Sequence, residues 1–252
     1  MKQVIVFFVI LCSVIGCDDK NDIKPKKVFE GSVNFMTQEE IDDFVINNYT
    51  HVTGNIKVGD YFQRNTSITD LSGLNFLVSV GENLVIANND ALTNLQGLEN
   101  LSSVSRYFDI VGNTNLANIN SLSNLTEVGG ILLISFNDAL INLNGLNNLR
   151  VIGSDLVVSA NSSLTTLEAL SNISTVGRKL TIQGNQALHS LSGLNNVRSV
   201  GAGLSILGNS SLTNYCDLRP LLNSNGLIGP FEVSFNSYNP TQQSIKDGNC
   251  SQ

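Results

Sequence analysis

The sequence predicts a mainly β protein: a right-handed parallel β-solenoid of 24-residue coils with a short N-terminal cap helix. Three observations lead to this prediction. Apolar and Asn positions recur every 24 residues through the middle of the chain. Each copy opens with an apolar–x–apolar alternation, which is typical of a strand. Charged residues are only 14% of the 252 residues, against roughly 25% in ordinary globular chains, whereas 34 Asn and 33 Leu are present.

Residues 1–16 have the pattern of a lipoprotein signal peptide. The apolar run Val4–Ile15 is shorter than the about 20 residues that span a bilayer, and it has the length of a signal-peptide core. It ends in Val-Ile-Gly-Cys, which resembles the bacterial lipobox, whose Cys becomes a lipidated N-terminus. Cys17 is therefore the expected lipidation site, and the polar residues 17–27 are the expected flexible tether. The alternative is an ordinary secretory signal in which Cys17 has no role.

Acidic residues follow Cys17 at once, at Asp18, Asp19 and Asp22. In Bacteroidetes-type lipoproteins such residues resemble a surface-export signal. In enterobacterial systems an Asp after the Cys instead resembles an inner-membrane retention signal. We expect a lipid-anchored protein of the cell envelope, in the outer membrane and exposed at the surface, with the periplasmic face as the alternative.

Residues 28–55 are expected to cap the first coil with a strand and a helix. The segment VFEGSVNF at 28–35 has the pattern of a strand. Thr37 is followed three residues later by Glu40, which is the spacing of a capping box, so a helix is expected to run to about Val45. The first copy is longer than the others, which predicts an inserted loop at 60–65.

The repeat solenoid is expected over residues 56–215. Four apolar series with the 24-residue step begin at Leu84, Leu92, Leu98 and Val104. Stacking buries the apolar face that one coil cannot bury alone. A sixfold series of Asn shares the step, and we expect it to form a buried ladder that satisfies backbone groups at each bend. Its members are Asn89, Asn113, Asn137, Asn161, Asn185 and Asn209.

The second half of each copy has an apolar residue at every third position, as from Leu92 to Val104. One side of a helix could show this spacing. The intervening residues are Asn, Ser, Thr and Gly, which are poor helix formers, and Gly97, Gly145 and Gly193 interrupt the run. Short strands separated by tight turns are therefore expected.

Residues 216–252 are expected to form a C-terminal cap. A short helical turn is expected from Asp217 to Leu222, and FEVSFN at 231–236 resembles a last strand and bend. Cys216 and Cys250 are an even pair in an exported chain, which is most simply a disulfide that clips the cap to the last full coil. Metal ligation is a poor rival, because a zinc site needs three or four ligands and the chain has two His.

Copies such as LVIANNDALTNLQGLENLSSV and LTIQGNQALHSLSGLNNVRSV resemble bacterial relatives of the receptor L domain, a solenoid related to leucine-rich repeats. Ordinary leucine-rich repeats have one residue between the Asn and the next Leu, whereas two intervene here. The resemblance covers roughly residues 28–250. With the lipobox, it implies a surface lipoprotein of Bacteroidetes type. Its bacterial members often end in such a cysteine pair and carry an N-P-T-Q-Q stretch like that at 239–243.

The chain shows no pattern of a catalytic, metal or cofactor site. His51 and His189 are isolated, and Asp42 and Asp43 are adjacent and point in different directions on the expected helix. Nucleic-acid binding is disfavoured by the net charge of −7 and the pI of about 4.7. Sequons would matter only in a eukaryotic secretory pathway, which the lipobox argues against. They include Asn65, Asn124, Asn161 and Asn209.

The outward positions of the expected strands form a partly apolar strip, which is a candidate binding surface. Its apolar members are Val85, Val111, Leu133, Val157 and Leu207. Simple β-propensity is the competing explanation, because Val suits strands in any case.

These patterns favour a non-catalytic envelope lipoprotein that presents a solenoid surface for protein or glycan recognition and adhesion. The membrane, through the N-terminal lipid, is one expected partner, and the protein or glycan ligand is unknown. A structural spacer without a specific ligand is the alternative. A glycan-active β-helix enzyme is a third class, and the scattered outward charges argue against it. The sequence does not predict an oligomeric state.

Overall fold

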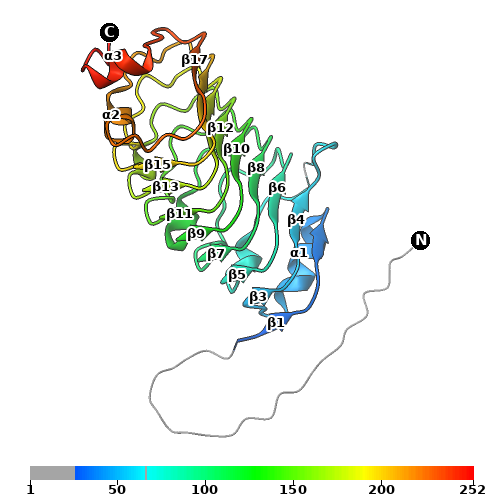
Figure 1. Cartoon of the computed structure of the whole chain (residues 1–252). Helices are drawn as coiled ribbons and strands as arrows, with labels where there is room; N and C mark the ends of the chain where they lie inside the picture. Colours follow the sequence, from blue (N-terminus) through cyan, green and yellow to red (C-terminus); the bar gives the residue numbers. More distant parts are fainter. Residues whose placement is uncertain (1–25, 66) are drawn as a thin grey trace, which may run out of the picture.

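The computed structural model describes residues 26–65 and 67–252. The signal peptide, Cys17 and most of the expected tether therefore lie outside the described residues. The described chain is a parallel β-solenoid, in which each coil contributes one strand to each of two sheets (Figure 1). Strands of one sheet alternate along the chain with strands of the other, as the 24-residue repeat predicts.

The eight-stranded sheet contains two-residue strands that pair in parallel in chain order. They are β1 (Val28–Phe29), β3 (His51–Val52), β5 (Ser79–Val80), β7 (Ser103–Val104), β9 (Glu127–Val128), β11 (Val151–Ile152), β13 (Thr175–Val176) and β15 (Ser199–Val200).

The nine-stranded sheet has longer strands and carries the candidate site. They are β2 (Val33–Phe35), β4 (Ile56–Gly59), β6 (Leu84–Ala87), β8 (Phe108–Val111), β10 (Leu132–Ser135), β12 (Leu156–Ser159), β14 (Lys179–Gln183), β16 (Gly203–Leu207) and β17 (Phe231–Ser234). The register is in phase with the repeat, because Phe108 pairs with Leu132 and Leu132 with Leu156. Equivalent side chains therefore lie about 4.8 Å apart along the solenoid.

The N-terminal cap contains the expected helix, α1 (Gln38–Val45). Thr37 and Glu40 form the capping box, and Ile41 is fully buried. The expectation of one strand over residues 28–35 is wrong. Gly31 adopts a φ of 109°, which turns the chain, so β1 and β2 belong to different sheets.

The half-coil between the Asn and the next short strand is built from turns, so the expected short strands are absent from this part of the described coils. The N–H of Leu98 donates to the carbonyl of Leu95 at 3.1 Å, and Leu101 donates to Leu98 at the same distance. This i to i+3 bonding is the 3₁₀ pattern, and its period of three residues explains the apolar spacing.

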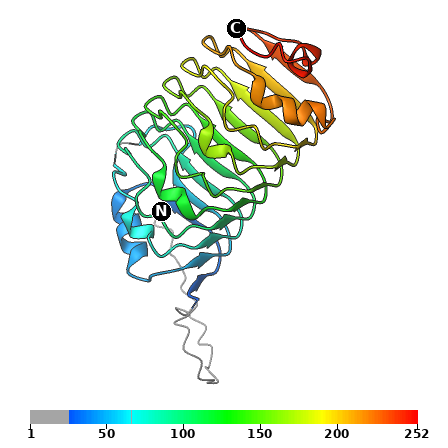
Figure 2. The same cartoon turned by 90° about the vertical axis from the view of Figure 1, so that its left-hand side faces the viewer.

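Four of these turns are regular enough to form 3₁₀ helices, and Figure 2 shows such turns as short ribbons along one side of the solenoid. They are η1 (Ser72–Leu74), η2 (Asn120–Asn124), η3 (Glu168–Leu170) and η4 (Cys216–Leu218). Their first residues are 48 residues apart, so the coils alternate in pairs. The intervening coils carry Gly97, Gly145 and Gly193, which have φ values of 110°, 112° and 108°.

The six Asn of the repeat lie in one column and are fully buried. In each step the backbone N–H and the Nδ2 of one Asn donate to the Oδ1 of the next, as from Asn137 to Asn161 at 3.1 and 3.2 Å. The Nδ2 of Asn137 also donates to the carbonyls of Ile110 and Ser135. These bonds satisfy backbone groups that each bend would otherwise leave unpaired. The column is therefore a structural device inside the wall of the solenoid.

The column has different endings at its two ends. At the C-terminal end Asn209 donates to Asn236, and Asn236 donates to the Oδ1 of Asn239 in the same turn. At the N-terminal end the Oδ1 of Asn89 accepts no hydrogen bond within the described chain. Asn65 stands 24 residues earlier, but its N–H donates to the carbonyl of Asn88. Asn65 is thus in backbone register with Asn89, but its Nδ2 donates to the carbonyl of Met36 and does not continue the column.

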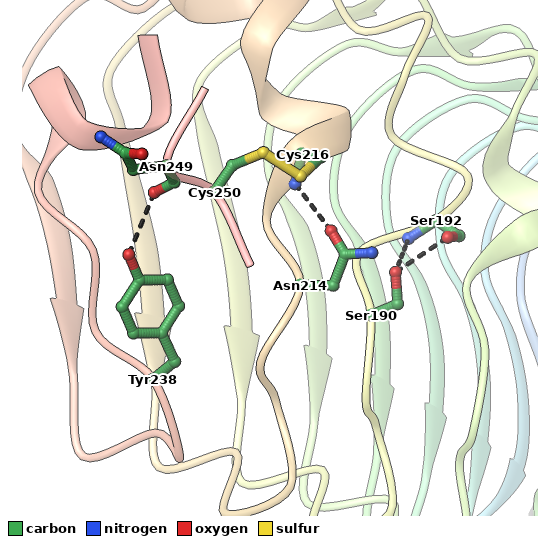
Figure 3. Close-up of a disulfide and its surroundings, with 7 residues drawn as sticks. All are labelled: Ser190, Ser192, Asn214, Cys216, Tyr238, Asn249 and Cys250. Carbon is green, nitrogen blue, oxygen red and sulfur yellow. Dashed lines mark hydrogen bonds between the residues drawn. A yellow bond between two sulfur atoms is a disulfide. The ribbon is translucent and has the colours of Figure 1, made fainter. Parts of the chain in front are cut away.

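The C-terminal end is closed on the turn side by two short helices, α2 (Arg219–Asn223) and α3 (Gln242–Lys246), which pack together. The disulfide between Cys216 and Cys250 is present and joins the chain end to the coil that carries η4 (Figure 3). Next to it the Tyr238 hydroxyl donates to the carbonyl of Asn249 at 3.0 Å. No helix in the described residues is long and apolar enough to cross a bilayer.

Candidate binding surface

The candidate surface is the outer face of the nine-stranded sheet, defined as the side chains that alternate away from the core. Two positions of each strand lie on it. The first outer column contains Lys57, Val85, Asp109, Leu133, Val157, Thr181, Ser205 and Glu232. The second contains Gly59, Ala87, Val111, Ser135, Ser159, Gln183, Leu207 and Ser234.

The five apolar residues of the expected strip all lie on this face and are half-buried, but they do not form one continuous strip. Val111, Leu133 and Val157 stand on the neighbouring strands β8, β10 and β12. Val85 is separated from Leu133 by Asp109, and Leu207 is separated from the others by β14. The face therefore has a central patch, which we define as Val111, Leu133 and Val157 together with Phe136 and Ala160.

Phe136 and Ala160 belong to a third column that the sequence did not bring to notice. It is formed by the residue just before each ladder Asn, and every member has a positive φ. Its members are Asn88, Gly112, Phe136, Ala160, Gly184, Gly208 and Phe235. Glycine adopts this left-handed conformation freely, whereas a bulky residue adopts it at a cost of about 1–2 kcal/mol. Three glycines immediately before a repeated Asn were the available sequence signal.

Phe136 is the most unusual member of the central patch. Its φ is 58° and its side chain is 59% exposed. The neighbouring coils place Gly112 on one side of it and Ala160 on the other, so the ring has no large neighbour in this column. A strained, exposed aromatic residue is costly for the fold, and such strain is found preferentially at functional sites.

The N-terminal edge of the face is covered by the inserted loop. The hydroxyl of Tyr61 hydrogen-bonds to Asp109, and the Lys57 ammonium lies 5.9 Å from the centre of the Tyr61 ring. Because Val85 stands between Lys57 and Asp109 in the register, Tyr61 spans the strand that carries Val85. Val85 is thus less available to a partner than Leu133.

Burial shifts the pKa values of Asp109 and Tyr61 at this corner of the face. Desolvation raises the pKa of Asp109, and the hydrogen bond from Tyr61 opposes this shift. Desolvation and the neighbouring Asp109 also raise the pKa of Tyr61. The corner therefore binds protons more readily than free Asp and Tyr, and its polar groups satisfy one another.

Charges lie at the two ends of the outer face. Lys57 pairs with Asp60 at the N-terminal end, and Lys179 lies 3.8 Å from Glu232 at the C-terminal end. The outer columns of β10, β12 and β16 contain only uncharged residues. The central patch is therefore apolar and uncharged. Asp109 borders it on β8, and Ser, Thr and Gln border it elsewhere.

The other sequence-derived candidates are not brought together. His51 contacts the neighbouring Thr50 hydroxyl, and His189 lies in a different coil. The described residues contain no group of three or more His, Cys, Asp or Glu that could hold a metal ion. Cys17 lies outside the described residues.

Comparison with protein families gives one match. The family model described as the receptor L domain matches residues 107–190, a shorter stretch than the resemblance seen in the repeats. No curated protein and no solved structure gives a match. The matched stretch runs from the start of β8 to the half-coil after β14 and includes the central patch. Residues 107–190 are thus similar to the receptor L domain, a typically non-catalytic binding domain, within a parallel β-solenoid.

Proposed function

We propose that this chain is a non-catalytic, lipid-anchored protein of the cell envelope that recognises a partner through the outer face of its nine-stranded sheet. The observation that supports the proposal most directly is the central patch around Phe136. It combines an exposed aromatic ring and half-buried aliphatic side chains with a backbone conformation that costs stability. Similarity to a binding domain over the same residues agrees with this reading.

A protein partner is favoured by the chemistry of the patch. Val111, Leu133, Val157 and Ala160 are aliphatic, and a single aromatic anchor among them is typical of a protein–protein contact. A glycan is the second candidate, because the isolated Phe136 ring, with Gly112 and Ala160 beside it, offers an open face for stacking.

The test compares two variants, each of which replaces one of the two Phe residues with a positive φ, Phe136 or Phe235. The chain is immobilised and exposed to envelope and secreted proteins and, separately, to a glycan panel. Phe136→Asn combined with Leu133→Ser and Val157→Ser should abolish capture. Asn tolerates a positive φ, so the first substitution should leave the fold intact.

Phe235→Asn is the matched control, because Phe235 has a similar φ of 60° but lies four coils away. This control should retain capture. Competition by soluble glycan would select the glycan partner. Equal capture by all three proteins would contradict the proposed surface, and no capture by the parent chain would favour a structural spacer.

Membrane attachment has its own test. Cys17→Ala should move the protein from the membrane fraction to the soluble fraction, because the lipid would no longer be attached. Persistence in the membrane fraction would contradict the lipoprotein proposal. Digestion of intact cells with protease should degrade the solenoid if it faces outward, whereas protection would place it on the periplasmic side.

A further inference from the structure

The last strand of the nine-stranded sheet, β17, is an open edge. It pairs with β16 on one side, and no described strand lies on its other side. Inward residues of the internal strands, such as Leu204 and Ile206 of β16, are fully buried. The corresponding Phe231 and Val233 of β17 are only half-buried. This edge thus lacks a covering layer over its apolar side chains.

The opposite end of the solenoid is better covered. The helix α1 packs on β2, where the inward Phe35 is 3% exposed and the inward Val33 is half-buried. At the C-terminal end α3 packs on α2, on the turn side of the coil. In Figure 1 the two ends lie at opposite extremes of the solenoid. Solenoids usually carry a polar cap at each end, so the uncovered β17 needs an explanation.

The backbone of β17 is also unpaired on its outer side. The carbonyls of Pro230 and Ser234 accept hydrogen bonds from Leu204 and Gly208 of the preceding coil at 2.9 and 3.0 Å. By the alternation of a parallel ladder, the N–H and C=O groups of Phe231 and Val233 point away from β16. Such a row of donors and acceptors is best satisfied by another strand.

Two exposed apolar residues flank this edge. Ile228, shortly before β17, is 63% exposed, and Phe235, directly after it, is 85% exposed with a φ of 60°. The strand itself contains no Lys and no Pro, which are the residues that usually discourage edge-to-edge pairing. Glu232 is the one charged residue of the strand and lies on its outer side, so the inward side chains of the edge are apolar and its backbone is available for pairing.

We infer that β17 is a self-association edge that pairs with β17 of a second copy of this chain, antiparallel about a two-fold axis at Val233. In this register the two Val233 residues face each other and exchange backbone hydrogen bonds. Glu232 of one copy faces Ser234 of the other, and Phe235, which follows the strand with a φ of 60°, flanks the paired segment on its outer side. The two nine-stranded sheets then continue into each other with their core faces on the same side.

The side chains select this register over the one with its axis at Glu232 and over shifts by one residue. A two-fold axis at Glu232 would place two like charges directly opposite each other, which is destabilising. A register shifted by one residue would place outward side chains opposite inward ones. The Val233 register avoids both conflicts. A self-complementary surface is what a two-fold dimer requires.

The dimer would join the solenoids by their C-terminal ends and leave their N-termini at opposite extremes. On a lipid-anchored protein this geometry could link molecules held in two facing membranes. That consequence rests on the proposed function, whereas the pairing itself does not.

The register is tested by cysteine cross-linking of the full chain in intact cells. Val233→Cys places two thiols opposite each other across the axis, where Cα atoms about 5.5 Å apart allow a disulfide. Ser234→Cys is the matched control. Its own copy would be about 7–8 Å away on the diagonal, which is too far for a disulfide. Non-reducing gels should show a covalent dimer for Val233→Cys. They should show no covalent dimer for Ser234→Cys or for the parent chain.

The association is tested by measuring the molecular mass of the full chain carrying Cys17→Ala over a concentration series. We expect twice the monomer mass at high concentration. Ser234→Asp should weaken the dimer about tenfold, because in this register it places a second carboxylate opposite Glu232 on both sides of the axis. Phe136→Asn should leave the dimer unchanged.

Two outcomes would overturn the proposal. One is a monomer at every concentration together with no Val233→Cys cross-link. The other is equal cross-linking of both cysteine variants. Loss of partner capture with an intact dimer would contradict the proposed function alone.

Discussion

The buried Asn column shows how one side chain can specify a bend. From Asn113 onward each Oδ1 accepts two hydrogen bonds, from the backbone N–H and the Nδ2 of the preceding Asn. Each Nδ2 also donates to a carbonyl of the preceding coil, as Asn113 does to Ile86. Asp has no amide donor, and Gln would place its amide one carbon further out. The requirement for a short amide explains why the position is Asn in six consecutive copies.

Replacing a central member should therefore be costly. Asn137→Ala leaves the N–H of Asn113 without its acceptor and the carbonyl of Ile110 without the Nδ2 donor. Each unsatisfied buried group costs about 1–3 kcal/mol, so we expect a loss of about 3–5 kcal/mol in the free energy of unfolding, measured by urea denaturation.

Asn148→Ala is the control for this variant. Asn148 makes one exposed bond to the carbonyl of Ser123, and its loss should cost less than about 1 kcal/mol. Equal losses for the two variants would show that the column contributes no more than an ordinary surface Asn.

The turn-rich half-coil depends on glycine for reasons of space as well as conformation. A Cβ on Gly145 would lie 2.0 Å from the carbonyl oxygen of Ile119 in the neighbouring coil, and its φ is 112°. Gly184 also has a positive φ, of 67°, but the nearest atom to a Cβ there is 3.6 Å away. The two positions separate the steric requirement from the conformational one.

Gly145→Ala should lower the free energy of unfolding by about 2–5 kcal/mol, because the clash adds to the backbone strain. Gly184→Ala should cost about 1–2 kcal/mol, since the left-handed region is the only obstacle and Ala160 already occupies it in another coil. Thermal or urea unfolding measures both. A similar cost at the two positions would mean that the neighbouring carbonyl moves aside easily.

The elements differ in how far the sequence could predict them. The α1 helix followed from Thr37 and Glu40, and the strand pairs followed from the apolar alternation and the 24-residue step. The three-residue spacing predicted short strands because the intervening Asn, Ser, Thr and Gly disfavour an α-helix, although its period is that of a 3₁₀ turn. The left-handed column and the Tyr61 contact with Asp109 depend on neighbouring coils, so a single copy could not reveal them.

The residues that make up the candidate binding surface were less predictable from the sequence than the fold. The outward positions of Asp109, Leu133 and Val157 followed from alternation, but the contact of Tyr61 with Asp109 across the strand of Val85 depended on where the inserted loop folds. Phe136 was missed because its exposure results from a backbone turn that lies outside the strand pattern. A repeat sequence predicts what all coils share, whereas a binding site is made by what one coil does differently.

The whole molecule is a linear stack whose true unit is a pair of coils. The 3₁₀ helices begin at residues 72, 120, 168 and 216, and the glycine turns at 97, 145 and 193 lie between them. Each glycine packs against the coil that carries a 3₁₀ helix: Gly97 against Leu71, Gly145 against Ile119 and Gly193 against Leu167. The alternation of glycine turns and 3₁₀ helices is therefore a feature of how neighbouring coils pack on each other.

Deletion variants can test this two-coil unit. Removal of residues 126–173 takes out one pair, keeps the 24-residue register and places Gly193 over the Ile119 coil, as Gly145 is now. Removal of residues 126–149 also keeps the register of strands and Asn, but it stacks the η3 coil directly on the η2 coil. Ala169 would then face the Ile119 carbonyl where a glycine with positive φ now stands.

Because each coil contacts only its neighbours, one poor interface should divide the cooperative unit of the solenoid. The longer deletion should unfold in urea in one transition, with a slope reduced in proportion to its length. The shorter deletion should unfold in two steps, with fast amide exchange at the junction, although it removes half as much chain. Equal cooperativity in the two variants would mean that any coil can stack on any other, and that the alternation of glycine and 3₁₀ turns is not required by the packing.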